Sequence, residues 1–140
     1  MKQTITIIAI FFAVLIQTGF ASGMRTVVTP ENRVIEDKIY LVVIEPTPGV
    51  DGFKQVRVVV PKSSFQPLSK LYFRLGDSDK PQISCELSLT QGSSATSEAF
   101  FTISDELLPK VTVTAHYADW SRGSGSTFYD FHLKDWIGYR

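Results

Sequence analysis

The sequence predicts an all-β fold, a single antiparallel β-sandwich of about seven strands, on three observations. Apolar and polar residues alternate in several short segments, as in Val56, Val58 and Val60, which is the pattern of a half-buried strand. Pro, Gly, Asp and Ser separate these segments and are typical of turns. No stretch after the first apolar segment has a convincing helical period. Short strands at close spacing favour a sandwich.

The first predicted strand covers residues 34–44 and includes a continuous apolar run at residues 39–44. Such a run is typical of a strand that is covered on both faces or lies centrally in its sheet. The second predicted strand covers residues 56–60. It ends at Pro61, because proline cannot donate a hydrogen bond to a neighbouring strand.

Five more segments repeat the alternating pattern, with a polar loop at residues 91–96 between two of them. We place these strands at residues 71–75, 83–89, 98–103, 111–117 and 127–133. Ser104 and Pro109 bracket a single helical turn, since serine can cap a helix start and proline ends one.

Residues 107–115 read Leu-Leu-Pro-Lys-Val-Thr-Val-Thr-Ala. This stretch resembles the corner before the sixth strand of a fibronectin type III domain. The resemblance covers nine residues. It implies an immunoglobulin-like, fibronectin III-like sandwich rather than a barrel.

Residues 1–21 have the layout of a secretory signal peptide. Lys2 supplies a positive start, residues 5–16 are nearly all apolar, and Gly19 and Ala21 are small. The apolar run is about 12 residues, whereas a membrane-spanning helix needs about 20. We therefore expect a secreted or periplasmic protein with no stable membrane insertion after cleavage.

Cleavage is expected after Ala21, with Gly23 as the alternative site. Residues 22–32 would then form a loose N-terminal arm, and residues 33–140 the β-sandwich domain. A chain of 140 residues suits one such domain.

Charge and cysteine content narrow the function classes. The chain has 14 Lys and Arg against 14 Asp and Glu, with no block of one sign, so we expect no nucleic-acid partner. The single cysteine rules out an internal disulfide. Cys85 shares strand parity with Ile83 and Leu87, which predicts a buried, inert thiol. No cofactor motif is present in the sequence, and we expect no cofactor.

One hypothesis is a metal site built from His116, Asp130 and His132. If residues 111–117 and 127–133 form a hairpin that pairs His116 with Asp130, the three side chains could gather on one surface. Two imidazoles and a carboxylate are a plausible ligand set for Zn²⁺. The alternative is two exposed histidines in ordinary cross-strand pairs.

A second hypothesis is a binding patch made of Trp120, Arg122 and Phe128, in and beside the Gly- and Ser-rich loop at residues 119–126. Exposed aromatics beside a loop can anchor a protein partner or stack on sugar rings. The alternative is that Trp120 and Trp136 cap the two ends of the core.

These observations predict an exported, non-catalytic binding module that interacts with another protein in the periplasm or at the cell surface. Contact could be made through loops or by pairing with an exposed edge strand. One alternative is a carbohydrate-binding module that uses exposed aromatics. A second alternative is a metal-dependent or hydrolytic enzyme that requires one of the two histidines.

Overall fold

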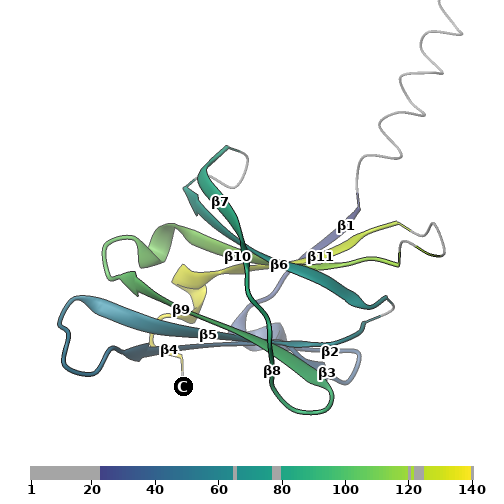
Figure 1. Cartoon of the computed structure of the whole chain (residues 1–140), viewed down its shortest axis with the longest axis horizontal. Helices are drawn as coiled ribbons and strands as arrows, with labels where there is room; N and C mark the ends of the chain where they lie inside the picture. The colour runs from purple at the N-terminus through teal and green to yellow at the C-terminus, as the bar shows by residue number, and fades with distance from the viewer. Residues whose placement is uncertain (1–22, 65, 77–79, 120, 122–124, 140) are drawn as a thin grey trace, which may run out of the picture.

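A computed structural model describes residues 23–64, 66–76, 80–119, 121 and 125–139 (Figure 1). In this part of the chain two β-sheets lie face to face, with a short hairpin beside them. The first sheet has five strands in the order β1-β11-β10-β6-β7, and the second has four in the order β4-β5-β9-β8. The prediction of an all-β sandwich is confirmed.

The elements have the following bounds. The five-stranded sheet contains β1 (Met24–Val27), β6 (Leu68–Gly76), β7 (Pro81–Leu87), β10 (Val111–Tyr117) and β11 (Thr127–His132). The four-stranded sheet contains β4 (Leu41–Pro46), β5 (Phe53–Pro61), β8 (Thr90–Gln91) and β9 (Thr96–Ser104). The hairpin pairs β2 (Val34–Ile35) with β3 (Lys38–Ile39), and the 3-10 helices are η1 (Pro30–Asn32), η2 (Leu108–Lys110) and η3 (Leu133–Trp136).

The core lies between the two sheets. Val56, Val58 and Val60 of β5 are buried, as are Val113 and Ala115 of β10. Successive side chains of a strand point to opposite faces, so each sheet contributes one apolar layer. Burying one valine side chain fully contributes about 1.5–3 kcal/mol.

The helix η3 closes the core through Trp136. This residue is fully buried, and its indole N–H donates a hydrogen bond to the Val28 carbonyl over 3.3 Å. Its ring packs against Phe131 and stands edge-on to Tyr139. Trp136 is therefore a core residue, whereas Trp120 lies outside the described residues.

The prediction of one continuous strand over residues 34–44 is wrong. This segment forms β2, β3 and β4, because the chain turns at Glu36 and Asp37, whose φ angles are 52° and 63°. Two successive residues at positive φ make the tight turn of a short hairpin. β4 also lies at the edge of its sheet rather than centrally, and Ile39 is exposed.

The N-terminal arm is more ordered than expected. Met24–Val27 form β1, which pairs in parallel with β11, and Val28 is buried in the core. Asn32 ties down the next turn, because its side-chain oxygen accepts a hydrogen bond from the Thr29 backbone N–H over 2.6 Å. A strand of four residues is too short for alternation to become a clear pattern.

Cys85 is exposed, so the prediction of a buried thiol is wrong. Cys85 does lie on the core-side face of β7, because it pairs with Phe73, whose side chain packs against the core. However, β7 is an edge strand, and β8, the strand at one edge of the opposite sheet, has only two residues. The core-side face of β7 is therefore left open, and Ile83 is 53% exposed for the same reason.

A helical turn follows β9, but it differs from the expected one. It is the 3-10 helix η2, Leu107 is its N-cap, and Pro109 lies inside the helix rather than ending it, because proline is tolerated in the first turn. The Leu107 backbone N–H donates to the Ser104 carbonyl over 3.2 Å and approaches the Ser104 hydroxyl oxygen at 3.4 Å. The turn connects β9 of one sheet to β10 of the other.

The predicted signal peptide, residues 1–21, lies outside the described residues. Among the residues that are described, no helix combines the length and apolarity needed to cross a membrane.

Candidate functional site

The patch predicted from Trp120, Arg122 and Phe128 is only partly described, because Trp120 and Arg122 lie outside the described residues. Phe128 lies on the face of the five-stranded sheet that points away from the core. Its ring stacks on the His116 imidazole, with centroids 4.6 Å apart and planes 10° from parallel. The Arg25 guanidinium carbon lies 4.5 Å from the Phe128 ring centroid. Phe128 is thus packed between two neighbours and remains partly exposed.

The pairing expected for the metal hypothesis is wrong by two residues. β10 and β11 do form a hairpin, but Asp130 lies opposite Thr114, and His116 lies opposite Phe128. His132 lies opposite Thr112 and is hydrogen-bonded to its hydroxyl over 3.0 Å. Within the described ranges, no group of three or more His, Cys, Asp or Glu side chains is arranged to hold a metal ion.

Asp130 is held by two other groups. One Arg25 guanidinium nitrogen donates to both carboxylate oxygens, over 2.8 and 2.7 Å. The Thr114 hydroxyl donates to Oδ1 over 2.6 Å. Thr114 is fully buried and Asp130 nearly so, and buried polar groups are costly unless they are hydrogen-bonded. The carboxylate therefore has a structural role on this face.

His116 and Ser126 form a pair of the type used in nucleophilic catalysis, with the imidazole Nε2 2.8 Å from the serine hydroxyl. Burial lowers the pKa of His116, and the positive charges of Lys70 and Arg25 lower it further. A neutral imidazole could act as a base. A triad also needs a third group that orients the base. The Asp130 carboxylate, on the same face of the sheet, is engaged by Arg25 and Thr114.

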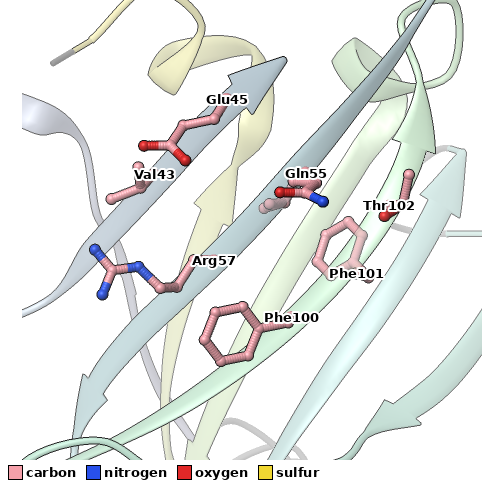
Figure 2. Close-up of a pocket in the computed structure, with 8 residues that line it drawn as sticks. Val43, Glu45, Gln55, Arg57, Phe100, Phe101 and Thr102 are labelled. Carbon is pink, nitrogen blue, oxygen red and sulfur yellow. The ribbon is translucent and has the colours of Figure 1, made fainter. Parts of the chain in front are cut away.

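A different surface, on the outer face of the four-stranded sheet, has the character of a binding site. A shallow groove of about 480 Å³ runs across β4, β5 and β9. Figure 2 shows its side chains, and on the outer face they are Val43, Glu45, Gln55, Arg57, Phe100 and Thr102. We call these six residues the sheet groove.

The sheet groove is built from two rows of cross-strand neighbours. Val43 lies opposite Arg57, and Arg57 lies opposite Phe100. The next row pairs Glu45 with Gln55, and Gln55 with Thr102. Directly opposed side chains of antiparallel strands are neighbours about 5 Å apart at Cβ. The first row therefore presents an aliphatic, a cationic and an aromatic group side by side, with polar groups beside them.

Phe100 is the more exposed of the two apolar residues in the sheet groove, with 58% of its surface accessible. Arg57 is half exposed and lies 3.4 Å from a Glu98 carboxylate oxygen. A contact of that length between partly exposed groups adds little stability, so the guanidinium can turn to a different partner at small cost.

The surface continues from the sheet groove to the edge of the sheet. A second hollow lies along β4, lined by Val43, Ile44, Glu45, Pro46 and Tyr139. Val43 and Glu45 belong to both hollows. A partner could therefore contact the face and this edge of the sheet at once.

Two adjacent aromatic residues in the sequence point to the sheet groove. Phe100 and Phe101 are adjacent in a predicted strand, and adjacent residues point to opposite faces. One of the two rings must therefore lie outside the core. Phe101 packs inward and meets Phe73 edge-on at 5.3 Å, so Phe100 is the ring left outside.

No protein-family model matches this chain, and comparisons with curated proteins and with solved structures also found no match.

Proposed function

We propose that this protein is an exported, non-catalytic module that binds another protein through the sheet groove. The observation that carries the proposal is the exposed Phe100 beside Arg57 on the outer face of the four-stranded sheet, where Phe53 is exposed as well. No packing requirement of the sandwich explains an aromatic ring at that position.

The make-up of the sheet groove supports a protein partner. Aromatic residues and arginine are enriched at the centres of protein interfaces, and polar groups surround them. Here Phe100 and Arg57 lie in one row, and Glu45, Gln55 and Thr102 border them in the next. A partner that presents an apolar side chain next to an acidic one would match Phe100 and Arg57 together.

We also propose that the sandwich is immunoglobulin-like. The support is the strand order, because that fold places its first, second, fifth and fourth strands in one sheet and its third, sixth and seventh in the other. If the count starts at β4 and leaves out β7, the strands of this chain follow the same order. One sheet is β4-β5-β9-β8 and the other contains β11-β10-β6. β7 extends the second sheet as in variable-type domains, and β1 is added beside β11.

The proposed location, a periplasm or cell surface, rests on the sequence of residues 1–21. A positively charged start, an apolar middle and small residues at Gly19 and Ala21 are the features of an export signal.

The alternative partner is a carbohydrate, and one observation favours it. The sheet groove combines an exposed ring with side chains that can accept or donate hydrogen bonds, Glu45, Gln55 and Thr102. An aromatic platform flanked by such groups suits a sugar ring as well as a peptide.

The experiment compares the wild type with Phe100→Ala as immobilised baits in extracts of the cells that make the protein. We expect the wild type to retain a specific protein, and Phe100→Ala to reduce its recovery at least tenfold. The melting temperature should be unchanged, because an exposed side chain contributes less than about 0.5 kcal/mol to stability. Val27→Ala is the matched control, since Val27 is an exposed apolar residue on the other sheet.

Two outcomes would contradict the proposal. Equal recovery with wild type and Phe100→Ala would remove the sheet groove from the binding surface. Retardation of the wild type, but not of Phe100→Ala, in gels that contain a polysaccharide would favour the carbohydrate alternative.

A further inference from the structure

The edges of the two sheets differ in how far they are protected. β1 has four residues and β8 has two, while β4 ends in Pro46 and has Tyr139 beside it. Short strands, prolines and covering side chains are the features that prevent an edge from pairing with another chain. β7 is the exception, because it spans seven residues and its only proline, Pro81, is its first residue.

One side of β7 has no neighbouring strand among the described residues, and most side chains of β7 are exposed. Among the described strands, β7 pairs with β6 alone. Alternate N–H and C=O groups of an edge strand therefore point outward. Residues 82–86 are exposed, Ile83 and Cys85 among them. Apolar side chains on an unpaired strand edge are a template for strand addition.

We propose that a second copy of this chain occupies this edge. In the proposed dimer, β7 pairs antiparallel with β7 of the other molecule about a two-fold axis that passes between the two Cys85 residues. The five-stranded sheet then continues from one molecule into the other. Such an interface is isologous, since the same strand is used by both copies.

The sequence of β7 is self-complementary in this register. Ile83 lies opposite Leu87 of the second molecule, and both point to the apolar, core-side face. Ser84 lies opposite Glu86 of the second molecule on the other face. The two Cys85 residues lie opposite each other at the centre.

The neighbouring symmetric registers are less favourable. Moving the axis to Glu86 would place two carboxylates directly opposite each other, which is destabilising. Moving it to Ser84 would bring Pro81 opposite Leu87 of the second molecule, and proline has no N–H to donate. The register centred on Cys85 avoids both penalties.

This register also makes Cys85 a reporter of the dimer. Directly opposed residues of antiparallel strands have Cα atoms about 4.5 or 5.5 Å apart, and disulfides span about 4.4–6.8 Å. An interface of one strand pair is smaller than the roughly 1,200 Å² that stable complexes bury. We therefore expect a weak, concentration-dependent dimer that a disulfide can trap.

The test oxidises the purified protein with glutathione disulfide. The thiolate of one Cys85 displaces one glutathione and forms a mixed disulfide, and the Cys85 thiolate of the second molecule then displaces the other glutathione. The two electrons lost by the two thiols end on the two glutathiones released. We expect a covalent dimer on non-reducing gels to form at least tenfold faster than in a control variant. The control is Ser94→Cys in a Cys85→Ser background, since Ser94 is also exposed but lies outside β7.

A second measurement tests the register rather than thiol exposure. Ser84→Cys and Glu86→Cys, each in the Cys85→Ser background, should cross-link to each other when mixed and much less when each is alone. The proposal is overturned if Cys85 cross-links no faster than the Ser94 control. It is also overturned if the mixture of Ser84→Cys and Glu86→Cys forms no more covalent dimer than either variant alone. Neither result depends on the sheet groove, which lies on the other sheet.

Discussion

Asp130 illustrates how a residue that resembles a ligand can instead stabilise a sheet face. Its carboxylate joins Arg25 of β1 to Thr114 of β10 across β11. β1 is a parallel strand of four residues, so side-chain contacts of this kind add to the few backbone bonds that hold it.

We expect Asp130→Ala to lower the free energy of unfolding by about 1–3 kcal/mol, because the buried Thr114 hydroxyl loses its acceptor. Arg25→Gln should cost less than Asp130→Ala, since the Arg25 side chain is 44% exposed and Asp130 keeps the Thr114 hydroxyl as a donor. Urea denaturation measures the loss in the free energy of unfolding for both variants. If Arg25→Gln costs as much as Asp130→Ala, Thr114 is not the reason for the effect.

His116 should make stability depend on pH. Burial, followed by the positive charges of Lys70 and Arg25, lowers its pKa in the folded protein, while its ordinary value in an unfolded chain is about 6.5. The unfolded state then binds more protons below that pH, so stability is complete above about 6.5 and falls as the pH decreases.

The free energy of unfolding, measured from pH 7.5 to 5, should therefore fall more steeply for the wild type than for His116→Gln. The other titrating groups are common to both proteins, so the difference between the curves isolates this imidazole. Parallel curves would show that His116 protonates as easily in the folded protein as in the unfolded chain.

Among the secondary-structure elements, β5 shows the most direct link between sequence and packing. Val58 is fully buried in the core, whereas Val59 points to the outer face and is half-buried. The two residues have the same side chain and are adjacent in one strand, so they form a matched pair.

We expect Val58→Thr to lower the free energy of unfolding by about 1–3 kcal/mol, because the change buries a hydroxyl among apolar side chains. Val59→Thr should change it by less than about 0.5 kcal/mol, as for other partly exposed positions. Chemical denaturation compares the two directly. Equal costs would mean that the parity assigned to β5 is wrong.

The sequence predicted the long central strands well and the edges poorly. Residues 56–60, 71–75, 98–103 and 111–117 alternate because each has one face in the core, and they match β5, β6, β9 and β10. The apolar run at residues 39–44 was misinterpreted, since Glu36 and Asp37 turn the chain before it and β4 lies at an edge. Cys85 has the correct parity, but parity alone does not say whether a second sheet covers the strand.

The two outer faces of the sandwich differ in how their side chains are packed. On the five-stranded sheet, Arg25, His116 and Phe128 stack on one another, and Asp130 is satisfied by its neighbours. On the four-stranded sheet, Phe100 is 58% exposed and the Arg57 side chain is 42% exposed. The outer face of the four-stranded sheet is therefore the one on which we propose the binding site.

The candidate site could not be deduced from local sequence. Val43, Arg57 and Phe100 lie far apart in the chain and become neighbours only through the order β4-β5-β9. The sequence-based patch relied on aromatic residues that are close in sequence, but Phe128 is packed between Arg25 and His116. Strand order, which sequence alone did not fix, decides which side chains share a surface.

Site-specific photo-cross-linking tests whether the partner lies on the outer face of the four-stranded sheet. Thr102→Cys and Val27→Cys, each in the Cys85→Ser background and labelled with a benzophenone maleimide, place the same probe on the two opposite outer faces. Thr102 borders Phe100 without replacing it. We predict that the probe at position 102 cross-links the protein retained by the wild type and that the probe at position 27 does not. Cross-linking from position 27 alone, or equally from both positions, would contradict the account.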